Sequence, residues 1–202
     1  MQAPNQQDPT RERLLHEAVT LFAARGFRGV SMRDLAQAVG ITPPALYNHF
    51  PNKEALYRAA VEAAFTESAA RLIGTLESTR PPLQRLRDFV RVMATEIHQA
   101  PDFRRLLQRE LLDADTEHLE FLRGFVFDQV LHPLMALMET LRPGDDAFLN
   151  ALMIIGMIKQ YADMAVLQAT ASADEGCRRS PEQIAEQVLR LVGPYFDTEK
   201  NG

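Results

Sequence analysis

Apolar residues recur every three to four positions through most of the chain, which is the spacing of a helix face. The first such run contains Leu14, Leu15, Ala18, Val19, Leu21 and Phe22. Long alternations of Val, Ile and Thr with polar residues, the usual strand pattern, do not occur. The sequence therefore predicts an all-α protein of about nine helices.

Turn and capping residues set the limits of the first two predicted helices. Pro9 suits the first position of a helix, and Gly26 suits its end. Ser31 followed by Asp34 is an approximate capping box that would open the second helix. Gly40 is the expected end of that short helix.

The third and fourth helices follow directly. The triplet Thr42-Pro43-Pro44 would start the third helix, and Pro51-Asn52 would break it. Asn52 can then cap a long fourth helix that reaches Leu76.

Pro81-Pro82 marks the next boundary, after which five further helices are expected. Pro133 lies inside one of them and is expected to kink that helix rather than end it. The predicted ranges are about 83–99, 102–112, 116–141, 145–171 and 181–196.

Residues 31–50, SMRDLAQAVGITPPALYNHF, combine two short helices and a tight turn. Small Ala36 allows the helices to approach, and Gly40 can adopt the left-handed turn conformation. These features fit a helix-turn-helix, but also two neighbouring helices of an ordinary bundle. The segment's expected core residues are Leu35, Ala36, Ile41, Leu46 and Phe50.

The charge distribution favours a DNA-facing amino-terminal part. The 202-residue chain is 46% hydrophobic and has a formal net charge of −5. Residues 1–58 hold seven basic against five acidic side chains, whereas the remainder holds 15 against 22. A basic head on an acidic body suits a protein that binds nucleic acid.

Several other classes of protein find no support in the sequence. The amino terminus has no signal-peptide pattern, and the uncharged run 147–158 is too short for a bilayer span, so we expect a cytoplasmic protein without a membrane anchor. The single Cys177 excludes an internal disulfide. No metal site and no cofactor are expected, because the histidines lack metal-ligand spacing and the usual enzyme motifs are missing. These histidines are His16, His98, His118 and His132.

The stretch from Phe22 to Leu56 closely resembles the signature of the TetR family of transcriptional regulators. It contains, in order, Gly-Phe, Ser-Met-Arg-Asp-Leu-Ala, Gly-Ile-Thr, Leu-Tyr-Asn-His-Phe and Lys-Glu-Ala-Leu. The rest of the chain matches the family only in length and helical layout. The resemblance implies a DNA-binding domain at 8–55, a ligand-binding and dimerisation domain at 56–200, and a TetR-like homodimer.

The same resemblance assigns DNA contacts residue by residue. Tyr47 and His49 correspond to side chains that reach phosphates, Lys53 to a phosphate clamp, and Ser31 to a hydroxyl that caps the second helix and touches the backbone. The positions at which the family varies its base-reading side chains hold Arg33, Thr42, Pro43, Ala45 and Asn48. Pro43 and the proline after it remove two backbone N–H donors from the amino-terminal end of the third helix. The sequence therefore does not indicate which operator bases this helix prefers.

The two last predicted helices carry the expected dimer contacts. Helix 145–171 is apolar around nearly its whole circumference, so more than one of its sides must be covered. The resemblance implies that it pairs with helix 181–196 and with both counterparts in a second subunit. The alternative is a fully buried core helix in a monomer.

A small-molecule effector is expected between the fourth and eighth helices, again because of the resemblance. Met and aromatic side chains suit an adaptable apolar cavity, although such residues also form ordinary bundle cores. His98 and Tyr161 are the candidate polar anchors. The other candidate liners are Met93, Ile97, Phe103, Phe121, Phe125, Met135, Met153 and Met157.

The sequence thus predicts a ligand-responsive regulator, a repressor that a small apolar molecule releases from a palindromic operator. Two alternatives stay open: an all-helical enzyme or cofactor carrier, and a DNA-binding dimer that has no small-molecule ligand.

Overall fold

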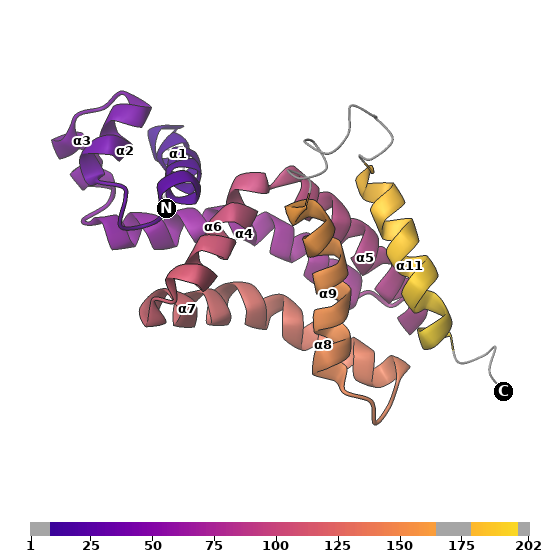
Figure 1. Ribbon diagram of the computed structural model, residues 1–202. Helices are drawn as coiled ribbons and strands as arrows, with labels where there is room; N and C mark the ends of the chain where they lie inside the picture. The colour runs from indigo at the N-terminus through magenta and orange to yellow at the C-terminus, as the bar shows by residue number, and fades with distance from the viewer. Residues whose placement is uncertain (1–8, 165–178, 198–202) are drawn as a thin grey trace, which may run out of the picture. The chain divides into compact units, whose positions relative to one another are not determined.

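The computed structural model describes residues 9–164 and 179–197. Within these ranges it has ten α-helices, one π-helical segment and no strand, which confirms the predicted all-α class (Figure 1). The first four helices are α1 (Pro9–Arg25), α2 (Met32–Val39), α3 (Pro43–His49) and α4 (Lys53–Leu76). The later ones are α5 (Pro82–Gln99), α6 (Pro101–Asp113), α7 (Thr116–Leu122), the π segment η1 (Arg123–Phe127), α8 (Asp128–Leu141), α9 (Ala147–Asp163) and α11 (Pro181–Phe196).

The predicted single helix at 116–141 is wrong in one respect, because η1 separates α7 from α8. This segment accounts for the tenth helix in the described part of the chain. Pro133 does lie inside α8 without ending it, as expected. Proline has no backbone N–H to donate, and its ring crowds the carbonyl of the residue four positions earlier. The wider π turn ends at Phe127, shortly before that carbonyl. Apolar spacing alone does not encode such a turn.

The predicted helix 145–171 corresponds to α9 over its first part. Asp146 is its N-cap, with a side chain that accepts a hydrogen bond from the backbone N–H of Leu149 at 2.9 Å. The expected continuation to 171 and the single Cys177 lie outside the described residues.

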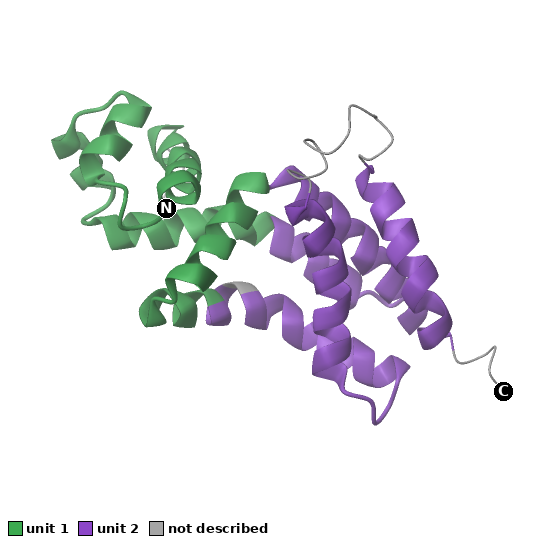
Figure 2. Ribbon diagram, viewed as in Figure 1, with its two compact units in different colours: residues 1–67, 101–122 green, residues 68–100, 123–202 purple. Residues whose placement is uncertain are grey.

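The chain forms two compact units, which Figure 2 colours separately. Unit 1 comprises residues 1–67 and 101–122, and unit 2 comprises residues 68–100 and 123–202. The chain therefore passes between the units three times, once inside α4. The compact unit around α2 and α3 also contains α6 and α7, so it is larger than the DNA-binding domain predicted at 8–55.

Unit 1 is built around α1, which packs against α2 and α6, while α2 packs against α3. Most of the expected core of the α2–α3 segment is buried, but Ile41 is only half-buried. The largest fully buried side chains of unit 1 are Leu14, Phe22, Leu35, Leu46, Leu56, Tyr57, Leu106 and Leu122.

Polar contacts join α6 to both halves of α1. The Thr20 hydroxyl donates to the Asp102 carboxylate at 3.1 Å. The Arg109 guanidinium donates to the carbonyls of Ala23 and Ala24 at 2.8 and 2.7 Å. Arg109 thus satisfies carbonyls at the end of α1 that have no partner within the helix.

Unit 2 is a helical bundle in which α5 packs against α11, α9 and α8, and α9 also contacts α8 and α11. A bidentate ion pair joins α4 to α5, since Arg71 donates to both oxygens of Glu96 at 2.6 and 2.8 Å. No helix in the described ranges is long and apolar enough to cross a membrane.

The turn between α2 and α3 gives a first prediction. Gly40 has φ +75°, and an added Cβ would meet no atom within 4 Å, so a substitution there costs backbone strain without a clash. We expect Gly40→Ala to lower the free energy of unfolding by about 1–2 kcal/mol in urea denaturation. Gly74→Ala is the matched control, because Gly74 lies inside α4 with equally open space around its Cβ. Gly74→Ala should raise the free energy of unfolding by about 0.5–1 kcal/mol. An equal loss of stability in both variants would contradict the backbone strain expected at position 40.

Candidate nucleic-acid interface

A complete capping box fixes the start of α2. The Ser31 hydroxyl accepts from the Asp34 backbone N–H at 3.2 Å, and the Asp34 carboxylate accepts from the Ser31 N–H at 2.8 Å. The bonds from the Ser31 hydroxyl and backbone hold the pKa of Asp34 below its usual value. The carboxylate is therefore a charged partner of Ser31, and the sequence prediction of this cap is confirmed.

The short helix α3 is capped by Thr42, whose hydroxyl accepts from the Ala45 N–H at 3.4 Å. Two prolines occupy the first helical positions, where the missing backbone donors have no partner within a helix. In α3 only Leu46 is buried. The exposed side chains of this helix, Pro43, Pro44, Tyr47 and Asn48, are therefore available to a partner molecule.

The predicted DNA-contacting side chains are accessible to different degrees. Tyr47 has 51% of its surface exposed. Ala45, His49 and Lys53 are half-buried. The others are exposed: Ser31, Arg33, Thr42, Pro43 and Asn48.

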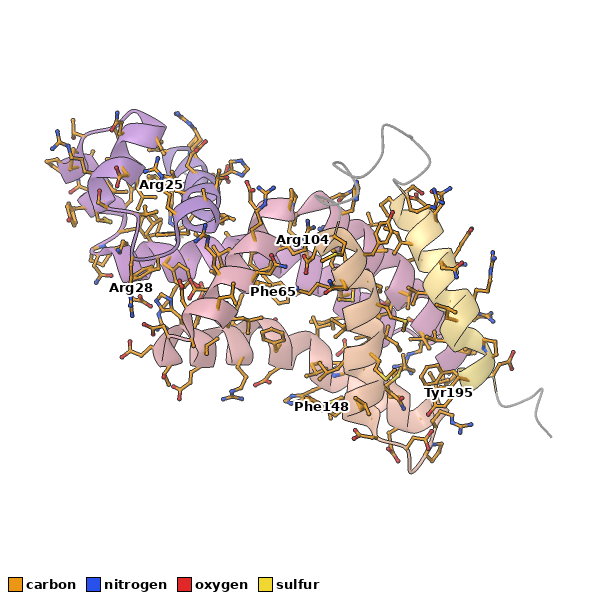
Figure 3. The ribbon with its side chains drawn as sticks, viewed as in Figure 1. Arg25, Arg28, Phe65, Arg104, Phe148 and Tyr195 are labelled. Carbon is orange, nitrogen blue, oxygen red and sulfur yellow. The ribbon has the colours of Figure 1, made fainter. Side chains whose placement is uncertain are left out.

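A surface depression of about 540 Å³ gathers four of these predicted residues, Ser31, Arg33, Tyr47 and Lys53. It is also lined by Arg28, which the sequence prediction missed and which lies on the turn between α1 and α2 (Figure 3). Three basic groups beside two hydroxyls are the chemistry that binds phosphate oxygens. The predicted residues outside this depression are Thr42, Pro43, Ala45, Asn48 and His49.

Arg28 could have been found from its position in the matched segment, since it is a basic residue between Gly26 and Ser31. Its side chain is 88% exposed and forms a 3.5 Å ion pair with Asp115. An ion pair of this kind in water contributes little, so it leaves the guanidinium ready for another anion.

Lys53 has a structural role in addition to its predicted phosphate contact. Its ammonium donates to the carbonyls of Phe27 and Val30 at 2.9 and 3.0 Å. It also lies 4.2 Å from the centre of the Phe27 ring, a cation–π contact. Lys53 therefore ties the start of α4 to the turn that precedes α2, and one of its three donors remains for a phosphate.

The predicted effector liners do not all belong to one unit. Phe103 and Phe121 belong to unit 1, where Phe103 stacks on Phe65 at 5.8 Å and Phe121 lies 6.5 Å from Tyr57. The liners in unit 2 are Met93, Ile97, His98, Phe125, Met135, Met153, Met157 and Tyr161. A single pocket that uses the whole set remains a prediction.

Two of these liners, Met157 and Tyr161, meet in a cleft of about 1010 Å³ between α9 and α11. Met93 is buried, whereas His98 and Met153 are exposed. The Tyr161 hydroxyl accepts a hydrogen bond from the backbone N–H of Arg179 at 2.8 Å.

The same two helices carry an exposed apolar surface, which we call the α9/α11 face. Phe148 on α9 and Tyr195 on α11 are labelled in Figure 3. Exposed apolar side chains that gather on neighbouring helices mark a candidate interaction site. The face comprises Phe148, Leu149, Leu152, Met153, Met164, Leu191 and Tyr195.

Residues 14–60 match the sequence model of the bacterial regulatory proteins of the tetR family. This segment is thus a TetR-type DNA-binding domain. Members of this family are DNA-binding regulators rather than enzymes. The recognition made from the sequence is thereby confirmed.

Individual relatives agree with this assignment. The Mycobacterium tuberculosis repressor KstR2 is 36% identical over 81 residues, 40% of this chain and 40% of KstR2. The Staphylococcus epidermidis negative regulator IcaR is 36% identical over 55 residues, 27% of this chain and 30% of IcaR. The alignments thus span less than half of these relatives.

The likeness extends to the whole fold in solved structures. Bacillus subtilis FadR, solved in complex with stearoyl-CoA, superposes with a TM-score of 0.72. The superposition covers 90% of this chain and 96% of FadR at 16% identity. The helices outside the matched segment therefore have the same fold as this regulator.

The two roles of Lys53 can be separated by stability measurements. We expect Lys53→Met to lower the free energy of unfolding by about 1–3 kcal/mol, because two carbonyls lose a charged donor. Tyr47→Phe removes an exposed hydroxyl of the same depression and should change stability by less than about 0.5 kcal/mol. Urea denaturation of both variants without DNA tests this. Equal stability of the Lys53→Met variant and the unaltered protein would show that the two hydrogen bonds contribute nothing.

Proposed function

We propose that this protein is a ligand-responsive transcriptional regulator, a repressor that a small apolar molecule releases from a palindromic operator. The observation that carries the proposal is the TetR-type helix-turn-helix, whose exposed α3 lies beside a depression lined by Arg28, Arg33 and Lys53. Phosphate contacts of such groups supply affinity and register, and base contacts from α3 supply specificity.

The functions of two relatives agree with this proposal. KstR2 is a transcriptional repressor and IcaR a negative transcriptional regulator. We propose the same direction of control here. Activity as an enzyme finds no comparable support from the described residues.

We propose that two copies pair through the α9/α11 face and form a homodimer. The face supplies large apolar side chains on both helices, and a two-fold axis would bury the same side chains of both copies. Such a dimer would place two copies of α3 in successive major grooves, about 34–36 Å apart.

The effector is proposed to be a small apolar molecule bound among the helices of the body. Bacillus subtilis FadR, a protein of the same fold, was solved with stearoyl-CoA. An effector that binds one conformation more tightly than another shifts the population toward it. In our proposal that shift pivots α4 and changes the distance between the two reading helices.

The operator can be found by selecting bound sequences from random DNA. An inverted repeat is the expected outcome, and no enrichment would contradict the proposed function. Compounds are then screened for release of that DNA, and calorimetry on the free protein distinguishes an effector-responsive repressor from a DNA-binding dimer without a ligand.

The depression gives a prediction about salt dependence. We expect Arg28→Ala to weaken operator and non-specific DNA alike and to reduce the slope of log affinity against log salt by about 0.9. Tyr47→Ala should also weaken operator binding, by roughly tenfold. Arg87→Ala is the matched control, because Arg87 is an exposed arginine of α5 in unit 2. Fluorescence anisotropy at several salt concentrations measures all three. If Arg28→Ala behaved like Arg87→Ala, the depression would not bind phosphate.

The proposed dimer predicts a change in molecular mass. Leu191 on α11 is 62% exposed, and Leu191→Glu would place a charge in the centre of the proposed contact. We expect this variant to sediment as a monomer at concentrations where the unaltered protein is a dimer. The control is Leu112→Glu in α6, since Leu112 is 84% exposed and lies outside the α9/α11 face. An undiminished dimer in the Leu191→Glu variant would assign the contact to another surface.

A further inference from the structure

Unit 1 contains a buried histidine that contacts two carboxylates. The Nδ1 atom of His118 lies 2.8 Å from Oε2 of Glu110, and its Nε2 atom lies 3.0 Å from Oε2 of Glu54. The His118 side chain is 6% exposed and that of Glu110 is 2% exposed, whereas that of Glu54 is 35% exposed. The three residues belong to α7, α6 and the first turn of α4.

The two short contacts require two protons. A neutral imidazole has one N–H and one lone pair, so it can donate to one carboxylate only. Its other nitrogen would then face a carboxylate oxygen, lone pair against lone pair. With both carboxyl groups ionised, the observed geometry is therefore that of an imidazolium that donates to both Glu110 and Glu54.

The surroundings of His118 favour this charged form. Burial alone would lower the pKa of His118, but the hydrogen bonds to Glu54 and Glu110 outweigh it and raise the pKa. Burial alone would raise the pKa of Glu54, but the bonds from His118 and Arg58 outweigh it and lower the pKa. The Tyr57 ring also stacks on the imidazole at 4.4 Å with an interplanar angle of 11°, and such a face attracts a cation.

Few other charged groups face this cluster. From α4, Arg58 donates to Oε1 of Glu54 at 2.6 Å, and the buried Tyr57 hydroxyl lies near Glu110 outside hydrogen-bonding geometry. From the region where α7 begins, Asp115 pairs with Arg28. The titration that matters is thus that of His118 between its two carboxylates.

The cluster is connected to the proposed DNA surface by direct contacts. Glu54 is the residue after Lys53 and shares the first turn of α4 with it. The Phe27 ring meets His118 edge-on at 4.5 Å, and Lys53 lies over the same ring. His118 therefore touches both segments, the α1–α2 turn and the start of α4, that line the depression.

We infer that His118, as an imidazolium, is a positioning residue for DNA binding, since it ties the DNA-contacting start of α4 to the buried Glu110 of α6. This inference rests on the proposed function. When His118 loses its proton, Nδ1–H keeps the buried Glu110, and Glu54 turns toward solvent, where Arg58 already holds it. The first turn of α4 is then no longer tied to α6 and α7.

The sign of the pH dependence follows from the two shifts. The His118 contribution is fully present below about pH 6.5, the ordinary pKa of histidine, and is lost as the pH rises through its raised pKa. The Glu54 contribution is present above about pH 4.3 and is lost as the pH falls through its lowered pKa. The tie to Glu54 therefore operates above about pH 4.3 and opens as the pH rises through the raised pKa of His118.

The test is the affinity for the selected operator between about pH 5 and 9 at constant ionic strength. Affinity should fall by roughly tenfold as the pH rises, with its midpoint at the pKa of His118 measured by NMR on the same protein. That pKa should lie above about 6.5. An affinity that does not change with pH, or a midpoint that does not follow the His118 titration, would overturn the inference.

Two variants separate the tie from a merely structural role. In Glu54→Gln, a neutral imidazole can accept a hydrogen bond from the Gln amide at Nε2 while Nδ1–H still donates to Glu110. This variant should keep its low-pH affinity as the pH rises through the pKa of His118. His118→Phe keeps the ring contacts but loses both hydrogen bonds, and should bind roughly tenfold more weakly at every pH. A Glu54→Gln variant that loses affinity with pH as the unaltered protein does would contradict the mechanism, even if His118→Phe fails to fold.

Two other histidines serve as controls. His132→Gln changes an exposed histidine of α8 in unit 2 and should leave the pH profile unchanged. His49 is itself a proposed phosphate contact, so His49→Gln should weaken binding without removing the pH dependence. If His49→Gln abolished it, the titration would belong to His49 and the inference about His118 would be wrong.

Failure of the inference and failure of the proposed function have different signatures. If no operator is selected at any pH, the proposed function fails. The tie itself is still measurable without DNA, because the melting temperature should fall as pH rises through the His118 pKa in the unaltered protein, but not in Glu54→Gln. If the operator is bound and this stability profile is flat, the tie is refuted and the regulator is not.

Discussion

Two hydrogen bonds donated by one lysine place the reading helices. The Lys53 ammonium at the start of α4 holds the carbonyls of Phe27 and Val30, which lie between α1 and α2. Those carbonyls belong to a turn that the capping box of α2 follows immediately. A long, rigid helix is thereby attached to a short one that could not be stable alone, since helices of seven or eight residues need tertiary support.

The contacts that hold Lys53 in the folded protein also restrict the motion of its side chain. A lysine that only contacted DNA would extend into solvent and lose its side-chain entropy on binding. Here most of that entropy is lost during folding, because two carbonyls and the Phe27 ring already hold the ammonium. The remaining donor is thus already oriented for the proposed phosphate contact, which would reduce the free-energy cost of binding.

Features encoded within a few residues could be predicted from the sequence. The capping box at Ser31, the left-handed Gly40 and the cap at Thr42 all depend on neighbours three or four positions away, and the structure contains each of them. The TetR resemblance was likewise carried by a local motif. Local chemistry therefore sufficed for the fold class, the limits of the first helices and the recognition of the family motif.

What the sequence could not provide were the contacts between distant segments. The helix at 116–141 had the apolar spacing of one continuous α-helix, and its π turn depends on where backbone hydrogen bonds shift by one residue. Arg28 became part of the depression only when the fold brought it beside Tyr47 and Lys53. His118 looked like any histidine without metal spacing, since Glu54 lies 64 positions away and Glu110 lies eight.

These contacts between distant segments join α6 and α7 mechanically to the helix-turn-helix. Unit 1 contains α6 and α7 together with the helix-turn-helix, joined through Arg109 to the end of α1 and through His118 to the start of α4. The chain leaves this unit at three points, inside α4, before α6 and after α7. Charged hydrogen bonds hold α6 and α7 to α1 and α4. A displacement at any of these three points therefore moves the connected helices together. In the proposed response to an effector, a pivot of α4 would therefore act on this whole set of helices rather than on α4 alone.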